Sequence, residues 1–369
     1  MNLAINRRMG ANRWTYTASL AIRNPTEIQG RPVLLGSDVS SEGSWKQALF
    51  NTTVDLAALG ASAVPKAVRM QLNIAIPSDI DVAIDVSGYC FGDHWGQGRV
   101  DALTKIYKKL KKGGALVILM PKTWGPFERI SKDSLNRMLS FVDLAFARDL
   151  TSQEYLIRIL NNDNQKKICF APDYTHEIEV QPDTPRSSVA YIIPSSRVVD
   201  SGAMAMNDYI DLFRTASDIF RINGVTPSLL IHETSKDLSF VEVASYMGIH
   251  SDNIIIAEGP DHAKSVIAGA QAVVTSRLHG LYNALNCQIP VAAVAWSFKY
   301  HEALKQYNCP LNFVDNRDPH NSIRELSKKI IDPKNTVHMK EQMKIGKEEC
   351  ARLTCRMWEK IFDTIEAAG

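Results

Sequence analysis

The sequence lacks long apolar runs, nucleotide-binding loops and closely spaced cysteines. It contains no stretch of about 18 uncharged apolar residues, so we expect no transmembrane helix. It contains neither a GxGxxG loop nor a GxxxxGK[ST] loop, which disfavours dehydrogenases and P-loop kinases. The 6 cysteines form no CxxC pair and no close Cys/His cluster, so we expect no metal site and no cofactor.

An excess of charge of one sign is also absent. The chain has 42 Lys and Arg residues against 40 Asp and Glu residues, which gives a formal net charge of +2. A dedicated nucleic-acid-binding protein normally carries a strongly basic domain, so we expect no nucleic-acid partner. The basic run Lys105–Lys112 indicates a solvated helix face that ends in cations, and at most a peripheral contact with membranes.

The start of the chain carries arginines but no apolar core after them, so we expect no secretory signal. Most cysteines stand among apolar residues, as Cys169 does between Ile168 and Phe170, and are interpreted as small core residues. A reducing compartment suits unpaired thiols. We therefore expect a cytoplasmic protein.

The arrangement of apolar residues predicts two domains. At roughly 100–200 residues per domain, 369 residues suffice for two cores. Short apolar runs alternate with longer amphipathic segments, which is typical of βα units and parallel sheets. The polar, Pro-rich segment Gln181–Pro185 interrupts this alternation and is the best linker candidate. We predict an α/β fold with two Rossmann-like domains facing a cleft, over residues 1–180 and 187–335, followed by a C-terminal helix over 336–369.

The elements expected in each domain follow from these runs. In the first, strands are expected at Pro32–Leu35, Val82–Val86, Ala115–Met120, Leu144–Ala147 and Ile168–Phe170, and helices at Gly43–Leu59, Arg99–Lys112, Lys132–Phe141 and Ser152–Leu160. In the second, strands are expected at Val189–Ile193, Ser228–Ile231, Asn253–Ala257, Ala272–Thr275, Val291–Ala295 and Asn312–Val314. Helices are expected there at Asp208–Ile222, Phe240–Met247, Asp261–Ala270, Leu281–Asn286, Tyr300–Gln306 and Ser322–Ile331, with a final charged helix from about Val337 to Ala367.

Ligands of such sheets bind beyond the carboxyl ends of the strands, so polar residues at those positions are the site candidates. Ser276, Arg277 and His279 follow the predicted strand that ends at Thr275, in the first turn of the next helix. Free backbone N–H groups and the helix dipole favour an anion there, and arginine adds a planar fork for phosphate or carboxylate. Histidine can pass a proton at neutral pH. An arginine in a surface ion pair and a capping histidine are the alternative interpretation.

The same pattern recurs after two other strands of the second domain. Ser195, Ser196 and Arg197 follow Val189–Ile193, and His232 with Glu233 follows Ser228–Ile231. The first segment is equally consistent with a plain turn that carries an exposed arginine. Three strand ends bearing Arg and His residues predict that the second domain holds a small anionic substrate.

In the first domain, aromatic and polar residues follow the predicted strands. We consider sugar contacts for the residues Tyr89, Asp93, His94, Trp124 and Arg148. An aromatic ring at these positions can stack on a sugar face, or can simply pack in the core. We therefore expect the acceptor side of an active site here.

The segment Ser276-Arg-Leu-His-Gly280, followed by Tyr282-Asn-Ala-Leu and Ile289-Pro-Val, resembles the C-terminal signature of the polysaccharide pyruvyl transferase family. The glycine-containing segment Asp85–Gly96, Arg148-Asp-x-x-Ser152 and Pro172-Asp173 are similar to first-domain segments of that family. Lys299 falls where relatives often carry a lysine. At the start, Leu3–Ile5 and the loop Arg8–Trp14 take the place of the family's first strand and Asn-x-Gly-Asp loop.

The resemblance implies a fold like that of the GT-B glycosyltransferases, with the last helix packing back on the first domain. It also implies transfer of a pyruvyl (1-carboxyethylidene) group from phosphoenolpyruvate to two hydroxyls of a lipid-linked or nucleotide-linked sugar, as in exopolysaccharide biosynthesis. In this scheme Arg277 and Arg197 clamp the donor, and His279 is the general acid or base with His232 in reserve. The residues Ser195, Ser196, Ser276 and Lys299 assist in donor binding.

Two other functions remain open from the sequence. A GT-B nucleotide-sugar glycosyltransferase would also hold a diphosphate at a helix start, and an acidic residue in Glu258-Gly-Pro-Asp261 could contact a ribose. A non-catalytic subunit of a polysaccharide assembly system is the third hypothesis. Phosphate release from phosphoenolpyruvate separates the first hypothesis from the other two.

Overall fold

The computed structural model describes residues 76–182 and 186–368 and, before them, residues 16–19, 30–33, 60 and 63–71. The chain forms two compact units, one made of the described residues up to Asp173 together with those from Thr354 on, the other of Tyr174–Leu353. Every strand pairing in both units is parallel. The α/β class predicted from the sequence is confirmed.

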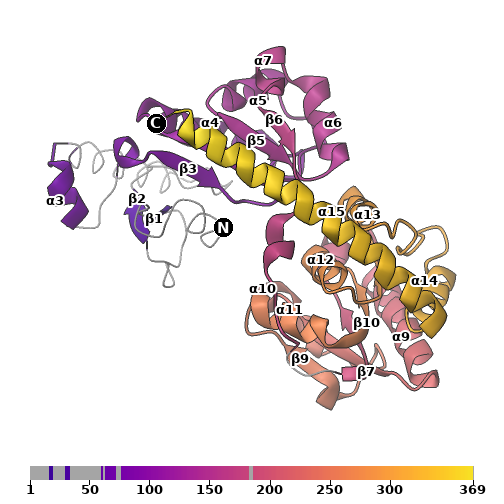
Figure 1. Cartoon of the computed structure of the whole chain (residues 1–369). Coiled ribbons are helices and arrows are strands. Elements are labelled where there is room, and N and C mark those ends of the chain that lie inside the picture. Colours follow the sequence, from indigo (N-terminus) through magenta and orange to yellow (C-terminus); the bar gives the residue numbers. More distant parts are fainter. Residues whose placement is uncertain are drawn as a thin grey trace. The chain divides into compact units, whose positions relative to one another are not determined.

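The sheet of the first unit has the strand order β3-β4-β5-β6. Its strands are β3 (Val82–Asp85), β4 (Leu116–Lys122), β5 (Leu144–Ala147) and β6 (Ile168–Phe170). The helices are α4 (Gly96–Lys112), α5 (Lys132–Leu139), α6 (Leu150–Ile159) and α7 (Asn162–Gln165), of which α4 packs on α5 (Figure 1). Residues of β4 and β5 are almost all buried, as expected for inner strands of a parallel sheet.

The sheet of the second unit has the order β11-β10-β7-β8-β9, so β7, first in sequence, is its central strand. Its strands are β7 (Arg186–Ile193), β8 (Thr226–Ile231), β9 (Ile254–Ile256), β10 (Ala270–Thr275) and β11 (Val291–Ala293). Helices α9 (Met206–Ile222) and α14 (Pro319–Lys329) run side by side (Figure 1). Helix α12 (Leu278–Asn286) contacts both α11 (Pro260–Ala268) and α13 (Phe298–Gln306).

The last helix, α15, extends over Pro333–Glu366. Its buried residues fall into two groups along the chain. Met339, Met343 and Cys350 join the core of the second unit, whereas Met357 and Phe362, also buried, lie in the part from Thr354 on that groups with the first unit.

Most predicted elements are confirmed to within a few residues, but two are wrong. The predicted helix Phe240–Met247 is a 3-10 turn, η3 (Leu238–Val241), followed by turns. Its backbone bonds include Ala244 N–H to Val241 O and Tyr246 N–H to Val243 O, which span three residues instead of the four of an α-helix. The predicted strand Asn312–Val314 makes only an isolated bridge, between Phe313 and Ala293.

Near the start, β1 (Tyr16–Ser19) and β2 (Gly30–Val33) pair in parallel, and α3 covers Lys66–Gln71. The strand predicted at Pro32–Leu35 overlaps β2 by two residues. The predicted helix Gly43–Leu59, the expected first strand Leu3–Ile5, the loop Arg8–Trp14 and residues 183–185 of the linker lie outside the described residues.

A buried ion pair lies at the carboxyl ends of β3 and β4. Lys122 Nζ, whose side chain is fully buried, lies 3.0 Å from Asp85 Oδ2 and donates to Ser87 Oγ at 3.0 Å. Burial by itself would raise the pKa of Asp85, but the Lys122 ammonium and hydrogen bonds from Ser87 and Tyr107 bring it down to about 2. The carboxylate is therefore ionised at neutral pH and compensated within the first unit.

Replacing Lys122 tests this pair. Lys122→Met leaves the Asp85 carboxylate buried without its cation, so we expect the free energy of unfolding to fall by about 3–5 kcal/mol in denaturant titrations. Lys111→Met is the matched control. The Lys111–Asp143 pair, at 2.5 Å, has a lysine that is 38% exposed, and we expect a loss of about 0–1 kcal/mol. Equal losses in both variants would contradict the role given to Lys122.

Gly346 in α15 tests the packing of the second unit. A Cβ atom at this position would lie 2.4 Å from Tyr307 Cα. We expect Gly346→Ala to lower the free energy of unfolding by about 1–3 kcal/mol, because overpacking against backbone outweighs the gain in helix propensity. Gly98→Ala in α4 is the control: its Cβ meets nothing within 4 Å, so we expect stabilisation of up to about 1 kcal/mol. Stabilisation by Gly346→Ala would contradict the close approach.

Candidate functional site

Three predicted site segments of the second unit meet at the carboxyl edge of its sheet. Central strand β7 is paired with β10 through Ile193 and Thr275, and with β8 through Ile192 and Leu229. The segments that follow these strands therefore leave the sheet side by side. The structure brings together the predicted residues that follow β7, β8 and β10, which are Ser195, Ser196, Arg197, His232, Ser276, Arg277 and His279.

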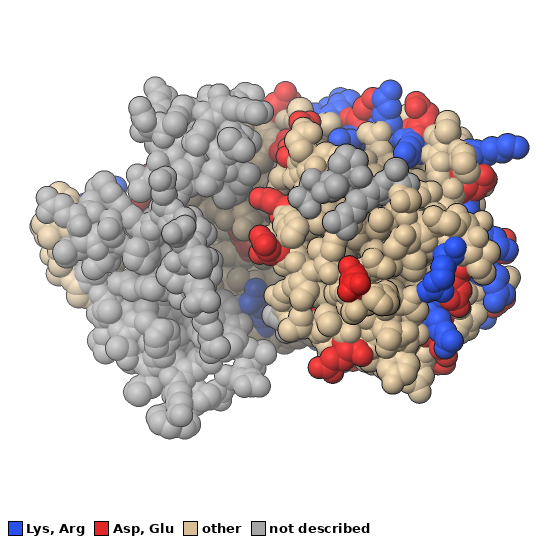
Figure 2. Space-filling model, turned by 90° about the horizontal axis from the view of Figure 1, so that it is seen from below, with Lys and Arg blue, Asp and Glu red and all other residues tan. Residues whose placement is uncertain are grey.

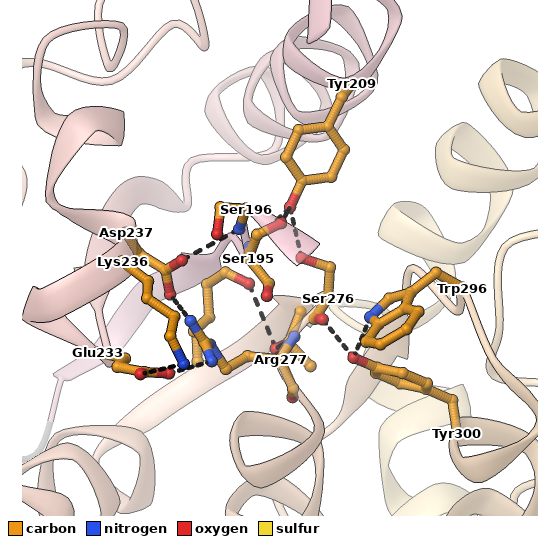
Figure 3. A network of polar contacts seen from close by, with 12 residues as sticks. Ser195, Ser196, Tyr209, Glu233, Lys236, Asp237, Ser276, Arg277, Trp296 and Tyr300 are labelled. Atoms are coloured by element: carbon orange, nitrogen blue, oxygen red, sulfur yellow. Dashed lines mark hydrogen bonds and ion pairs between the residues drawn. The ribbon is translucent and has the colours of Figure 1, made fainter. Parts of the chain in front are cut away.

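Hydrogen bonds from two tyrosines hold the segments after β7 and β10 (Figure 3). Ser195 N–H donates to Tyr209 Oη at 2.8 Å, and the Tyr209 and Ser276 hydroxyls share a hydrogen bond of 2.5 Å. The Tyr300 hydroxyl donates to the Ser276 carbonyl oxygen at 2.5 Å. Burial raises the pKa of both phenols, which therefore stay neutral. This network fixes the backbone of the two segments that carry Arg197 and Arg277.

The two serines in this network are buried. Ser195 and Ser276 were expected to bind the donor, but their side chains are buried, 2% and 0% exposed. Ser276 Oγ is already bonded to Tyr209. In this conformation both residues position the neighbouring arginines. Ser196 is half-buried, and its backbone N–H donates to Asp237 Oδ1 at 3.0 Å.

Arg277 lies between two carboxylates. Its Nη1 is 2.5 Å from Glu233 Oε2, and its Nη2 pairs with Asp237 Oδ2, while Lys236 Nζ lies 3.0 Å from Glu233 Oε1 (Figure 3). The guanidinium is 13% exposed, and its buried Nε has no hydrogen-bond partner in the part of the chain that the structure describes. Arg277 was predicted to clamp an anion directly, whereas here its two terminal nitrogens hold protein carboxylates.

Arg197 differs from Arg277 in its pairing. It is the first residue of the short helix α8 (Arg197–Asp200) and is half-buried. Among the described residues, none forms an ion pair with its side chain. Lys299, at the start of α13, is 8% exposed, and its Nζ lies 5.3 Å from the centroid of the Trp296 ring. Arg197 is therefore the arginine of this edge whose charge is available to an anion.

His232 and His279 lie in different environments. The Nε2 atom of His232 is buried and has no hydrogen-bond partner among the described residues. Burial, with the nearby His279 and Arg277, lowers the pKa of His232 to about 4, so its ring is neutral at neutral pH. His279 is exposed in the first turn of α12. Of the two, His279 is accessible for proton exchange, and His232 can offer one ring nitrogen to a ligand.

The start of α12 is arranged as an anion site. Its N-cap residue, Arg277, makes no side-chain hydrogen bond to the first turn, and its own backbone N–H donates to Thr275 Oγ1 at 3.0 Å. Gly280 allows the helix to begin directly at the strand end, since a Cβ there would lie 2.7 Å from Thr275 Oγ1. Helix N-termini with free N–H groups favour phosphate and carboxylate groups.

In the first unit, two of the five acceptor candidates are buried. Trp124 is 0% exposed, stacks on Phe91 at a centroid distance of 4.4 Å and donates its Nε1–H to Phe146 O. Arg148 is 3% exposed and pairs with Asp173 Oδ2 at 3.0 Å. A side chain without exposed surface cannot contact a sugar in this conformation. Trp124 is therefore a core residue, and Arg148 holds Asp173.

The other three acceptor candidates lie in the loop between β3 and α4. Half-buried Tyr89 contacts Trp95 edge to face at 6.1 Å, and exposed His94 contacts Trp95 at 5.7 Å. Trp95 itself is 40% exposed. Asp93 accepts backbone N–H groups from Glu128 and Arg129 at 2.8 and 2.9 Å, so its carboxylate anchors the loop. Tyr89, His94 and Trp95 form the aromatic surface of this unit that is open to a ligand.

Several residues of the site were missed from the sequence. Asp237 follows Glu233 at the i+4 position, a spacing that places two carboxylates on one face of a helical turn. Tyr209 lies in the predicted helix Asp208–Ile222, and nothing local marks its hydroxyl as a partner of Ser195 and Ser276. Lys122 stands at the end of an apolar strand run, which is itself a signal, because a lysine is almost never fully buried unless it is paired.

No group of three or more His, Cys, Asp or Glu residues that could hold a metal ion occurs in the described part of the chain. No described helix is both long and apolar enough to cross a bilayer. On the coloured part of the face in Figure 2, acidic and basic side chains are scattered among uncharged ones, and the described residues there form no continuous basic surface.

Comparison with solved structures shows the fold. A glycosyltransferase from Rickettsia africae has 12% sequence identity and a TM-score of 0.51, and the match covers 89% of this chain and 83% of that one. Anabaena Alr3699/HepE, solved in complex with UDP, has 11% identity and a TM-score of 0.52 over 81% and 89% of the two chains. TarM, at 10% identity and a TM-score of 0.46 over 79% of this chain, is matched over only 55% of its own length. The likenesses to the Rickettsia glycosyltransferase and to Alr3699/HepE show a GT-B fold.

Comparison of sequences shows the family. No curated protein is detectably similar in sequence. The family model for polysaccharide pyruvyl transferase, however, matches residues 11–297, which include both the loop after β3 and the Ser276–Gly280 segment. That match spans well over half of the chain, and the protein therefore belongs to the polysaccharide pyruvyl transferase family.

Proposed function

We propose that this protein transfers a pyruvyl group from phosphoenolpyruvate to a sugar of a cell-surface polysaccharide or its precursor, with formation of a pyruvate ketal. One observation carries the proposal. At a single sheet edge, Arg197, which has no ion-pair partner among the described residues, occurs together with the start of α12, which has no side-chain cap. Two buried atoms at the same edge, Arg277 Nε and His232 Nε2, lack hydrogen-bond partners among the described residues. Buried polar atoms that lack partners among the described residues are expected where a ligand supplies them.

The donor matches this edge in charge and shape. In phosphoenolpyruvate the phosphate and the carboxylate are both attached to C2. The two anionic groups therefore need separate sets of hydrogen-bond donors. Arg197 and the N–H groups of α12 suit the phosphate, and the edge of Arg277 suits the carboxylate. Lys299 is proposed to add positive charge nearby.

The reaction can be written with its atoms in balance. A general acid, for which we propose His279, protonates the methylene carbon, and C2 becomes oxocarbenium-like. One sugar hydroxyl attacks C2, and its proton passes to a base. The C2–O bond to phosphate then breaks as the second hydroxyl attacks C2. The products are the ketal and inorganic phosphate, which takes the remaining proton.

We propose that the first unit binds the acceptor. The support is the partly exposed aromatic surface of Tyr89, His94 and Trp95, because aromatic rings can stack on the apolar face of a sugar. Asp93 would act by anchoring the loop that carries them. The acceptor is a lipid-linked or nucleotide-linked saccharide, which is consistent with a cytoplasmic enzyme that touches membranes at most peripherally.

The proposal is tested by incubation with phosphoenolpyruvate and a panel of lipid-linked and nucleotide-linked sugars. We expect phosphate release that depends on the acceptor, with a matching gain in acceptor mass. Hydrolysis or transfer of a nucleotide sugar, without phosphate release from phosphoenolpyruvate, would instead assign a glycosyltransferase. No turnover with any pair would favour a non-catalytic subunit.

In this assay, Arg277→Lys should lower kcat/KM for phosphoenolpyruvate by about 10- to 100-fold. The reason is that the point charge of lysine replaces a planar guanidinium, whose charged hydrogen bonds contribute most of the binding. Arg317→Lys is the control. Arg317 pairs with Asp315 on the surface and is 90% exposed, so its replacement should leave kcat/KM unchanged. Full activity of the Arg277→Lys protein would show that Arg277 does not serve the donor.

His232 gives a prediction for the dependence of stability on pH. Its pKa in the folded protein, about 4, lies below the ordinary 6.5, so between these values the unfolded chain binds a proton that the folded chain does not. The free energy of unfolding should therefore fall as pH drops from 6.5 to 4. His232→Gln should reduce this fall in urea titrations at pH 7 and 4.5, whereas His250→Gln, at a 71% exposed side chain, should not. Identical pH dependence in wild type and His232→Gln would contradict the burial of a neutral ring.

A further inference from the structure

The two carboxylates on Arg277 are not equivalent. Asp237 is 0% exposed, whereas the side chain of Glu233 is 33% exposed. Both belong to the short segment after β8, in which Glu233 precedes and Asp237 ends helix α10 (Thr234–Asp237). Because of this difference in burial, Glu233 can move from Arg277 into water, whereas Asp237 cannot.

Asp237 is fixed on both of its oxygens. Oδ1 accepts the Ser196 N–H at 3.0 Å, and Oδ2 pairs with Arg277 Nη2. It thereby connects the segments after β7, β8 and β10. Moving a fully buried carboxylate away from its cation costs several kcal/mol, so Asp237 stays in place whatever binds at the edge.

Glu233 is held more weakly. Its second oxygen, Oε1, is paired with Lys236, which is 45% exposed and belongs to the same turn. An exposed ion pair contributes little to stability. Glu233 can therefore turn into solvent together with Lys236, and Nη1 of Arg277 then becomes available to another anion.

We propose that Glu233 occupies, in the unliganded protein, the position on Arg277 that the carboxylate of phosphoenolpyruvate takes, and that Asp237 is the positioning residue that keeps Arg277 there. This inference rests on the proposed function. The occupant matches the ligand in chemistry, since both are carboxylates that can accept a charged hydrogen bond from the guanidinium. Donor binding exchanges one carboxylate for another, and the charge around Arg277 is conserved.

Two effects of opposite sign on phosphoenolpyruvate binding distinguish a competing Glu233 from a network that only stabilises the fold. Removing the charge of Glu233 removes a competitor, so binding of phosphoenolpyruvate should tighten. Removing the charge of Asp237 releases Arg277 from its position, so binding should weaken. A network that only stabilises the fold would lose affinity, or lose none, in both variants.

The test is titration calorimetry of the full chain with phosphoenolpyruvate. We expect Glu233→Gln to lower Kd by about 3- to 10-fold and Asp237→Asn to raise it by about 10-fold or more, with a smaller effect on kcat than on KM for Glu233→Gln. Glu242→Gln is the control: Glu242 is exposed, follows in the same stretch after β8 and forms no ion pair with Arg277 among the described residues, so its replacement should leave Kd unchanged. Far-UV circular dichroism and melting temperature verify that each variant is folded.

Small competitors identify the group that Glu233 mimics. Pyruvate, which has only the carboxylate, should inhibit the Glu233→Gln protein more strongly than the wild type, whereas inorganic phosphate should inhibit both equally. A Kd for phosphoenolpyruvate that is unchanged or raised in Glu233→Gln overturns this inference alone. Tighter phosphate inhibition with unchanged pyruvate inhibition overturns the carboxylate assignment. No binding of phosphoenolpyruvate to any of the four proteins overturns the proposed function as well.

Discussion

The carboxyl edge of the second sheet is organised around the compensation of one nearly buried charge. The guanidinium of Arg277, only 13% exposed, requires anionic partners, and the segment after β8 supplies Asp237 and Glu233. Asp237 in turn binds the backbone of Ser196 after β7. Three strand ends are thus tied by one ionic group. A site held in this way has its donors oriented before a ligand arrives, which is the arrangement that electrostatic catalysis needs.

The first unit follows the same physical rule with other residues. At the carboxyl ends of β3 and β4, the fully buried Lys122 is compensated by Asp85 and Ser87. The loop that follows β3 is anchored by Asp93 and leaves Tyr89, His94 and Trp95 at the surface. In both units a network of compensated charges holds the loops at the carboxyl edge of the sheet, which is where parallel sheets bind ligands. These loops carry the side chains that are open to a ligand.

Elements with strong periodicity could be predicted from the sequence, and elements with weak local signals could not. Strands β5 and β6 have the predicted bounds because their apolar runs end in turns. Phe240–Met247 has apolar residues at helical spacing, yet β-branched Val241 and Val243 and tight three-residue bonds favour turns instead. In the site, Arg197 and His232 were found from their place after strands. Tyr209 was not, because its neighbours in the sequence give no sign that its hydroxyl has partners. Those partners, Ser195 and Ser276, are distant in the chain.

The sequence by itself determined the alternation of strands and helices, the class of fold, and which charged residues follow which strands. These properties depend on neighbours within a few positions. Only the tertiary structure decided that Arg277 is paired, that Arg197 lacks an ion-pair partner among the described residues, and that Trp124 and Arg148 are buried. The physical reason is distance along the chain: Asp237 lies 40 residues from Arg277, and Asp173 lies 25 from Arg148. Pairing and burial at such separations follow from the order of strands in the sheet, and that order is not written in any local pattern.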